Sequence, residues 1–375
     1  MNPENTNIII IGGGLAGLTC AIHLLRSGLQ VMLIEKNTFP QHKVCGEYIS
    51  NEVLPYLRSL DIDPFALHPE QISRLVFSSP EGETISSDLP LGGFGISRFA
   101  LDNFIYEKAL ELGCVVIKDT VEQVSFSEDE FAITTHLSGT FKAKFVIGAY
   151  GKRANIDQKL QRDYILRKSP WLAVKAHYSG SFPDGLVAVH NFKGGYCGVS
   201  KVEDNRINIC YLADYKSFKV FKNIDEFQKE VMFKNPQLKQ IFESCTLVFE
   251  QPLTISQISF DKKEPVYDHI LMIGDTAGLI HPLCGNGMAM AIHSAKICAE
   301  LLIEYTKGRI ASRVGLEKRY ARQWDRTFKN RLLTGRILAA VLRRHLLFKP
   351  LLNLLVKFPS ALPFIIKLTH GKPFQ

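Results

Sequence analysis

The hydrophobic residues of this chain follow two patterns. In the first pattern, short continuous apolar runs end in a glycine or an acid. These runs lie at residues 8–11, 31–35, 145–148 and 269–273. A strand that is covered on both faces of a sheet has this composition, so each run predicts a buried strand of an α/β fold. Apolar residues at helical spacing in 18–25 and 101–112 predict helices, which Gly28 and Gly113 end.

The second pattern is an alternation of apolar and polar residues. It covers residues 171–178, 186–192, 196–202 and 206–212. Alternation predicts an antiparallel sheet with one solvated face, and we expect one amphipathic helix, about residues 224–242, to lie against it. Because the first pattern returns after residue 268, the alternating part is expected to be a domain inserted into the other one.

The first apolar run leads into Gly12-x-Gly14-x-x-Gly17 and then into a helix. In this arrangement Gly12 permits the tight turn, Gly14 lets a pyrophosphate approach the backbone, and Gly17 lets the helix pack closely on the strand. The helix N-terminus offers unpaired N–H groups to the phosphates. The second run ends in Glu35, whose carboxylate suits a ribose 2′-OH and disfavours a 2′-phosphate. The order of these elements predicts a dinucleotide site, and Glu35 disfavours NADP as its ligand.

A second glycine-bearing segment comes about 260 residues later. It consists of Gly274-Asp275, a loop with Pro282, and Gly285-x-Gly287, which opens a helix at Met288. An NAD site needs only the first segment, whereas FAD is longer. Asp275 can hold ribityl hydroxyls or a ribose, and the amides at 285–288 can face the flavin edge that becomes negative on reduction. We therefore expect FAD; the alternative is a helix cap and turn with a purely structural role.

The charge is concentrated in the last part of the chain. The net charge is +8, yet residues 319–375 hold 12 lysines and arginines against Asp325 alone, so they carry +11 and the first 318 residues −3. Nucleic acid is not an expected partner, because no known binding motif accompanies the charge. The body is expected to be an ordinary, slightly acidic globule.

The basic C-terminal segment predicts an amphipathic helix. On a helical wheel one side is apolar, with Tyr320, Trp324, Phe328, Leu338, Leu342 and Leu346. The other side is basic, with Arg322, Arg326, Lys329, Arg336 and Arg343. Such a helix suits the surface of an anionic membrane. The alternative is that the apolar side packs on the body while the charges are solvated.

Other features restrict the class of protein. The eight cysteines form no CxxC pair, which argues against a zinc site and a disulfide framework, so no metal is expected. The first residues form no basic leader, and no apolar run reaches about 18 residues, so we expect neither a signal peptide nor a spanning helix. The expected location is the cytoplasm, at the inner face of the membrane if the C-terminal segment binds lipid.

With these motifs, the chain resembles FAD-dependent oxidoreductases of the p-hydroxybenzoate hydroxylase fold, and in particular the geranylgeranyl reductase family and related flavin monooxygenases. The resemblance covers about residues 6–300 and also rests on Lys43-x-Cys45-Gly46-Glu47 and Arg98-x-x-Leu101-Asp102. It implies that Arg98 contacts the FAD pyrophosphate or the adjacent ribose. The residues expected at the FAD are Gly12, Gly14, Leu15, Ala16, Gly17, Glu35, Lys36, Cys45, Arg98, Val121, Gly274, Asp275, Gly285, Gly287 and Met288.

The chain also departs from these families at three points. Tyr150 stands where the hydroxylases have an aspartate, which puts their contact to nicotinamide in doubt. The Trp-x-Trp-x-Ile-Pro motif of flavin halogenases does not occur, which argues against a halogenase. Residues 194–199 lack the aromatic lipid-pocket motif of archaeal geranylgeranyl reductases. The substrate is therefore not inherited from the resemblance.

The expected fold is α/β (α+β overall), with a Rossmann-like FAD-binding domain, an inserted antiparallel-sheet substrate domain and a helical C-terminal tail. The FAD-binding domain is expected at 1–71, 96–165 and 266–310, the substrate domain at 72–95 and 166–265, and the basic tail at 311–375.

The expected function is an FAD-dependent oxidoreductase, coupled to NAD(P)H, that reduces C=C bonds of a hydrophobic, isoprenoid or lipid-like substrate. One alternative is an FAD monooxygenase that hydroxylates an aromatic or polyketide-like compound, and a more distant one is a flavin-binding partner protein without turnover. Because the flavin supplies the redox chemistry, few protein groups are required. We assign no catalytic residue: Cys45, Glu47, Tyr48 and His281 are candidates, and each has a structural alternative.

Overall fold

The central sheet of the nucleotide-binding part contains six strands. The computed structural model describes residues 7–221, 223–343 and 361–375. The sheet has the order β17 (Val266–Tyr267), β18 (Ile270–Met272), β10 (Phe145–Gly148), β1 (Ile8–Ile11), β2 (Val31–Glu35) and β6 (Val115–Lys118). All neighbours are parallel except β17 and β18. The four apolar runs of the sequence thus form four adjacent central strands.

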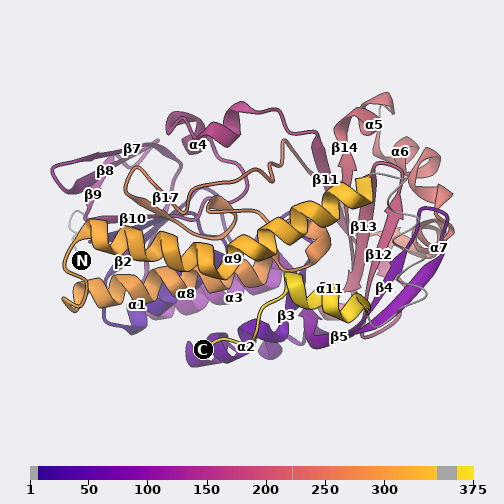
Figure 1. Cartoon of the computed structure of the whole chain (residues 1–375), viewed down its shortest axis with the longest axis horizontal. Helices are drawn as coiled ribbons and strands as arrows, with labels where there is room; N and C mark the ends of the chain where they lie inside the picture. The colour runs from indigo at the N-terminus through magenta and orange to yellow at the C-terminus, as the bar shows by residue number, and fades with distance from the viewer. Residues whose placement is uncertain (1–6, 222, 344–360) are drawn as a thin grey trace.

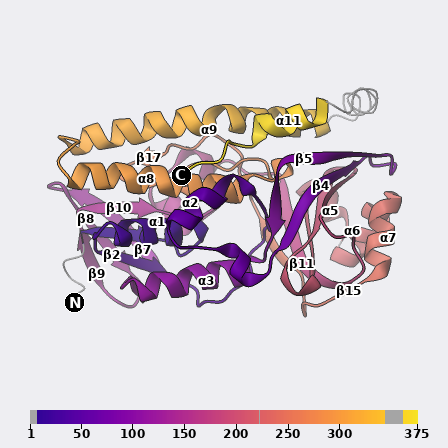
Figure 2. The same cartoon turned by 90° about the horizontal axis from the view of Figure 1, so that it is seen from below.

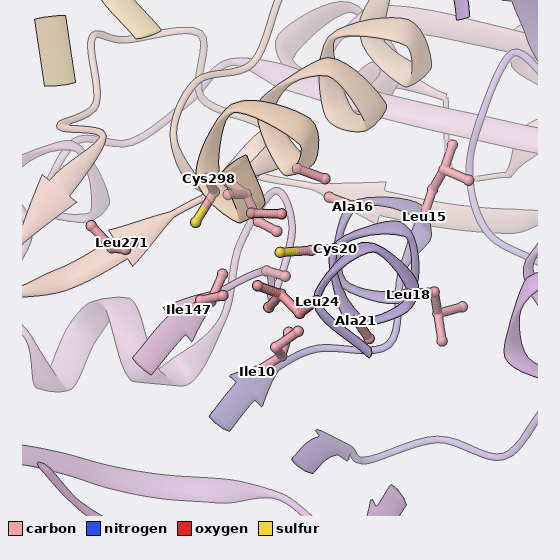
Figure 3. Packing of buried hydrophobic residues seen from close by; sticks show 14 of the residues in the cluster. Ile10, Leu15, Ala16, Leu18, Cys20, Ala21, Leu24, Ile147, Leu271 and Cys298 are labelled. Atoms are coloured by element: carbon pink, nitrogen blue, oxygen red, sulfur yellow. The ribbon is translucent and has the colours of Figure 1, made fainter. Parts of the chain in front are cut away.

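Helices cover this sheet and close the core. Helix α1 (Leu15–Arg26) packs against α8 (Gly287–Thr306) and α3 (Arg98–Glu111), and its apolar side chains meet those of the strands (Figure 3). A separate sheet of β7 (Val121–Ser127), β8 (Glu130–Thr135) and β9 (Thr140–Ala143) adds Phe131 and Ile133 to the same core. Shorter helices α2 (Leu54–Ser59) and α4 (Asn155–Lys159) lie in the connections.

The second part of the molecule is built on a nine-stranded sheet (Figure 1). Its strands run in the order β15 (Cys245–Leu247), β11 (Trp171–Gly180), β14 (Ile207–Asp214), β13 (Gly195–Lys201), β12 (Leu186–Phe192), β4 (Glu70–Ser78), β5 (Thr84–Gly95) and β3 (Tyr48–Ser50), and β16 (Leu253–Ser256) also pairs with β11. Residues 48–50 were expected in the nucleotide-binding part. They join this sheet because β3 pairs with the glycine-rich end of β5.

The two faces of the nine-stranded sheet differ. Val174, Ala176 and Tyr178 of β11 point to a core shared with the helices α5 (Tyr215–Val220), α6 (Ile224–Glu230) and α7 (Pro236–Ser244). Trp171 and Ala173, on the opposite face of the same strand, form a cluster with Leu279 and other residues of the nucleotide-binding part. This second face is therefore the one that meets the cofactor-binding half of the molecule.

The prediction of a single helix over residues 224–242 is wrong. Two helices occupy this segment, and they are separated by a short 3₁₀ turn and the pair Asn235-Pro236. Asn235 caps α7, since its side chain accepts the N–H of Gln237 at 2.9 Å, and it is fully buried. Proline at the first helical position and an asparagine cap before it are start signals that the apolar periodicity hides.

Within its described residues, the basic C-terminal segment forms two helices along one edge of the molecule, α9 (Arg313–Arg343) and α11 (Ala361–Thr369) (Figure 2). Tyr320, Trp324 and Phe328 are buried in the main core, so this part of the apolar stripe packs on the body. Leu346 and the apolar pieces at 351–356 lie outside the described residues, as do the side chains of Leu342 and Arg343. No helix in the described ranges is both long and apolar enough to cross a bilayer.

Trp324 provides a test of this docking. Its ring lies so close to Gly278 that a Cβ there would come within 2.7 Å of it. We expect Trp324→Ala to lower the free energy of unfolding by about 3–5 kcal/mol, because it leaves a large cavity under α9. The matched control is Leu333→Ala on the same helix, whose side chain is exposed and for which we expect a change within about 0.5 kcal/mol. Urea denaturation of the flavin-loaded proteins measures both, and equal stabilities would contradict the docking.

Candidate functional site

The first glycine turn is a place of backbone contact. Gly12 has φ +109°, and a Cβ there would overlap the backbone of Ala149 at the end of β10. A Cβ on Gly17 would overlap the carbonyl oxygen of Gly12. These contacts place the N-terminus of α1 directly over the ends of β1 and β10. Both glycines have the packing roles expected from the sequence.

Gly14 is different, because its missing side chain faces two cations instead of the backbone. A Cβ on Gly14 would lie 3.6 Å from Nη2 of Arg98 and 3.9 Å from Nζ of Lys43. Gly14 is also the N-cap of α1, which has no side-chain cap and no acidic residue in its first turn. An uncapped helix N-terminus beside two cations is a site for an anion. The pyrophosphate of a dinucleotide fits these donors.

The end of β2 lies beside the same turn. Glu35 is 8% exposed and accepts the N–H of Gly13 at 2.7 Å and that of Asn37 at 2.9 Å. Because Oε1 also accepts from the side-chain amide of Asn37 at 3.0 Å, Oε2 is the oxygen that keeps one more acceptor position, which a ribose hydroxyl can use. Of the neighbouring expected residues, Lys36 is exposed, whereas Val121 is buried at the start of β7.

The second glycine segment lies against the first one. Gly274 has φ +60°, and a Cβ there would come within 3.0 Å of Cβ of Ala16 in the first turn of α1. Its N–H donates to Oγ of Ser294 in α8 at 2.8 Å. The half-buried Asp275 is near enough to Arg98 to contribute to the raised pKa of that guanidinium. The two turns, about 260 residues apart in sequence, therefore converge on one region.

Buried cations hold the Asp275 turn from behind. Nζ of Lys263 donates to the carbonyl oxygen of Asp275 at 2.7 Å, and burial lowers the pKa of this lysine to about 8. Arg162, which is fully buried, donates to the carbonyl oxygen of Thr276 at 3.0 Å and pairs with Asp157 at 3.1 Å. Sequence reasoning missed Lys263 and Arg162, because a single basic residue in a loop carries no recognisable pattern.

The segment that opens α8 is fixed to the C-terminal region. Gly285 adopts φ +62° beside the ring of Tyr48, and α8 then begins without a side-chain cap. The side chain of Asn286 is engaged elsewhere, since it donates to the buried carboxylate of Glu52 at 2.9 Å. Arg331 of α9 contacts the same carboxylate at 3.4 Å, and the N–H of Gly371 also donates to it. Glu52 thus connects the expected flavin loop to both ends of the tail.

The two motifs behind the family resemblance hold each other in place. Nζ of Lys43 lies 2.9 Å from Asp102, and Arg98 forms two hydrogen bonds to the same carboxylate, at 2.6 and 2.7 Å. In the other direction, the N–H of Arg98 donates to Glu47 at 2.9 Å. Both cations hold the pKa of the buried Asp102 carboxyl below its usual range, although burial opposes this. The loop is therefore crosslinked to the start of α3 at two points.

Glu47 is also the centre of a buried ionic cluster. Its carboxylate lies 3.1 Å from Nζ of Lys175 and 2.6 Å from Nε2 of His177, and all three side chains are fully buried. Burial would raise the pKa of Glu47, but the hydrogen bond from His177 and the charge of Lys175 lower it overall. We name these three residues the Glu47 cluster.

Lys175 and His177 come from β11, on the face that meets the nucleotide-binding half, and sequence reasoning missed both. The available signal was two basic residues two positions apart in an otherwise apolar strand, since this spacing places them on one face. His42 covers the Glu47 cluster, with its ring 5.2 Å from that of His177. Partial burial and Lys175 lower the pKa of His42 to about 4, so its ring is neutral at pH 7.

Two thiols lie near the same loop. Cys45 is half-buried, and its carbonyl oxygen accepts a hydrogen bond from Asn208 of β14 at 3.3 Å. Cys210, two residues further along β14, is opposite Lys175 in the sheet. Burial, followed by the nearby Cys45, raises the pKa of Cys210 to about 12, so it remains a protonated thiol at neutral pH.

An apolar cleft adjoins the flavin loop. Rings of Trp171, Tyr196 and Phe260 surround the buried His281, with centroids 5.7, 5.8 and 4.7 Å from its ring. The cleft has a volume of about 290 Å³, and its walls are Arg167–Trp171, Ser259–Asp261, His281, and Arg336, Ala339 and Ala340 of α9. His281 is therefore part of an aromatic wall next to the loop that leads to Gly285.

Substitutions at Gly14 and Gly17 distinguish a role in cofactor binding from a role in folding. We expect Gly14→Ala to fold, because its added Cβ meets only ordinary contacts at 3.6 Å or more and its φ of −84° suits any residue. It should nevertheless lose FAD, since the methyl group occupies the pyrophosphate position. The matched Gly17→Ala should not fold, because its Cβ overlaps backbone. Flavin absorbance and circular dichroism of the purified variants measure the two effects, and an FAD-loaded Gly14→Ala protein would contradict the assignment.

The Glu47 cluster predicts a stability effect that depends on pH. Glu47→Gln leaves the Lys175 ammonium buried without a counter-charge, so we expect a loss of about 3–5 kcal/mol in unfolding free energy. Adding Lys175→Met should restore much of this loss, and the exposed Glu83→Gln is the neutral control. The lowered pKa of Glu47 means that its stabilisation exists above the ordinary value of 4.5 and is lost as the pH falls through the lower folded-state value. The difference between wild type and Glu47→Gln should therefore shrink below pH 4.5, and a constant difference would exclude an ionised Glu47.

The chain is similar to known flavoproteins over most of its length. The FAD binding domain family matches residues 5–323. Geranylgeranyl diphosphate reductase of Synechocystis is 24% identical, with 90% of this chain and 85% of the relative covered. Tryptophan 2-halogenase of Chondromyces crocatus is 23% identical over 79% of this chain, which spans 61% of the halogenase.

A solved structure gives the same result for the fold. The structure of the flavin-dependent brominase Bmp2 superposes on this chain with a TM-score of 0.81 at 18% identity. The superposition covers 99% of this chain and 94% of the brominase chain. The expected fold class and the expected FAD are thereby confirmed, and both reductases and halogenases are among the relatives. The chain belongs to the FAD binding domain family and is an FAD-dependent oxidoreductase.

Proposed function

We propose that this enzyme reduces C=C bonds of a hydrophobic, isoprenoid or lipid-like substrate and that a nicotinamide coenzyme, NAD(P)H, supplies the electrons. The observation that supports this most directly is the apolar character of the sheet face that meets the flavin half. Trp171, Ala173, Tyr196 and Leu212 form this face, together with Leu279 from the flavin half itself. A substrate without polar groups loses no hydrogen bonds with water when it enters such a surface.

The cleft beside His281 supports a substrate with an apolar body. The rings of Trp171, Phe260 and His281 line one part of it, which we name its aromatic floor, and Arg167, Lys168 and Arg336 also line it. An elongated alkene can lie along the aromatic floor. The cations can contact an anionic end group of such a molecule, if it has one.

The bound flavin supplies hydride transfer to and from carbon. The protein must hold it, exclude water and provide a proton for the second carbon of the reduced bond. Arg98, Lys43 and the N-terminus of α1 would hold its pyrophosphate, and Asp275 with the N-terminus of α8 would hold its other half. We name no proton donor among the residues of this face: Cys210 faces the flavin half near Cys45, but its raised pKa makes this thiol a weak acid at neutral pH.

The second candidate function is oxygen-dependent attack on an aromatic ring, by hydroxylation or halogenation. The Glu47 cluster favours it, because a buried ammonium beside an imidazole can stabilise the oxygen of a phenolate. These groups lie on the same sheet face as the apolar residues, although they are fully buried and do not line the cleft beside His281.

Reoxidation of the reduced flavin separates these functions. We reduce the FAD-loaded protein with NADH or NADPH under anaerobic conditions and add geranylgeraniol or an alkylresorcinol. For the reductase we expect the alkene alone to restore the absorbance of oxidised flavin, with the saturated product detected by mass spectrometry.

Other results of the reoxidation experiment would contradict the proposal. Reoxidation that requires O₂ and the resorcinol indicates hydroxylation, and an added requirement for chloride or bromide indicates halogenation. Failure of both nicotinamides to reduce the flavin would contradict the proposed electron donor.

A further inference from the structure

Tyr320, Trp324 and Phe328 of the tail are buried, but other large apolar residues of the tail are exposed. A second set points outward, with Leu333 48% and Ile337 54% exposed on α9, and Phe364 64% and Leu368 45% exposed on α11. Within each helix the two residues are four positions apart, so they lie on one face. Helices α9 and α11 contact each other and follow the same edge of the molecule (Figure 2). We name these four residues the tail patch.

Cations accompany the tail patch. Lys329, Arg336 and Lys367 are exposed on the same helices, and Arg322 and Arg326 are exposed on the preceding turns of α9. Asp325 is the only acid from Arg319 to the C-terminus. Exposed large apolar side chains beside unbalanced positive charge are the features of an interfacial helix that binds anionic lipid. A protein partner with no negative charge would not explain the strong bias.

We infer that the tail patch docks α9 and α11 onto the surface of an anionic lipid bilayer without crossing it. The four apolar side chains enter the boundary between headgroups and acyl chains, while the flanking lysines and arginines contact lipid phosphates. The earlier assignment of Tyr320, Trp324 and Phe328 to this role does not apply, because those side chains face the core.

The position of the apolar cleft is consistent with this docking. Arg336, Ala339 and Ala340 line the cleft, and Ile337 of the tail patch is the direct neighbour of Arg336. A docked molecule would therefore bring the cleft mouth close to the acyl chains. This last consequence, entry of substrate from the lipid, rests on the proposed function, whereas the docking itself does not.

The docking helices are also joined to the flavin loop. Arg331 lies two residues before Leu333, and Gly371 lies three residues after Leu368, and both contact Glu52. Glu52 in turn accepts from Asn286 in the turn that opens α8. A rigid connection of this kind fixes the tail patch relative to the cofactor site, so the cleft keeps one orientation to the membrane.

Vesicle binding tests the inference on the full-length, FAD-loaded protein. The probes are large unilamellar vesicles of phosphatidylcholine alone and of phosphatidylcholine mixed with phosphatidylglycerol. We expect the wild type to bind the anionic vesicles at least about tenfold more tightly and to lose this preference at high salt. Ile337→Ser/Phe364→Ser should weaken binding by at least about tenfold by removing the apolar contacts. Lys329→Gln/Arg336→Gln should lower the preference for anionic over neutral vesicles by about fivefold for each cation that is removed.

The matched control changes two exposed apolar residues elsewhere, Leu137→Ser/Val220→Ser, which are 80% and 74% exposed in the wild type. It should bind vesicles as the wild type does, and all variants should keep their flavin absorbance. Equal binding of the control and the tail variants, or no binding by the wild type, would overturn the inference. Dimerisation in solution that Ile337→Ser/Phe364→Ser abolishes, without vesicle binding, would assign the tail patch to a second copy of the chain. Vesicle binding does not depend on turnover. The docking can therefore be tested even if the proposed reaction is wrong.

Discussion

Contact between backbone segments, without side chains between them, is the constraint on which this site depends. Gly12 lies against the backbone of Ala149, Gly17 lies against the carbonyl oxygen of Gly12, and Gly274 is separated from α1 only by the methyl group of Ala16. These contacts bring the N-terminus of α1 close to the turn that leads to α8. Two uncapped helix N-termini then face one region, and an extended anionic cofactor can use both. Any side chain at these contacts would separate the two turns and divide the site.

The charged residues around this region are arranged so that carboxylates hold the cations from the protein side. Asp102 fixes Arg98 and Lys43, and Glu47 fixes Lys175. Such buried pairs contribute little net stability, because the cost of removing charges from water opposes their attraction. Their effect here is positional. They prevent the cations from turning to solvent and hold the Cys45 loop at the interface between the sheets.

The tail combines two roles on neighbouring faces of one helix. One face of α9 completes the core through Tyr320, Trp324 and Phe328, while Leu333 and Ile337 remain exposed. Glu52 connects α9, the segment after α11 and the flavin loop through a single buried carboxylate. Since desolvation raises the pKa of Glu52 and Arg331 opposes this, the three segments depend on one another for a satisfied charge. The described helices of the tail are therefore part of the folded body and not an appendage.

The sequence alone determined the elements whose signals are local. Four apolar runs predicted four buried strands, because each run is a local signal, and the spacing of Gly12, Gly14, Gly17 and Glu35 predicted the dinucleotide turn, because one strand–helix–strand unit holds all four residues. The flavin was predicted from two segments, and the structure shows that Gly274 and Ala16 lie together. Only the tertiary structure decided which apolar side of the tail is buried, since a helical wheel does not show what packs on it. The tertiary structure alone also brought Glu47 together with Lys175 and His177, which both lie about 130 positions after Glu47 in the sequence. A charged residue in an apolar strand acquires its role from the partner that the fold brings to it.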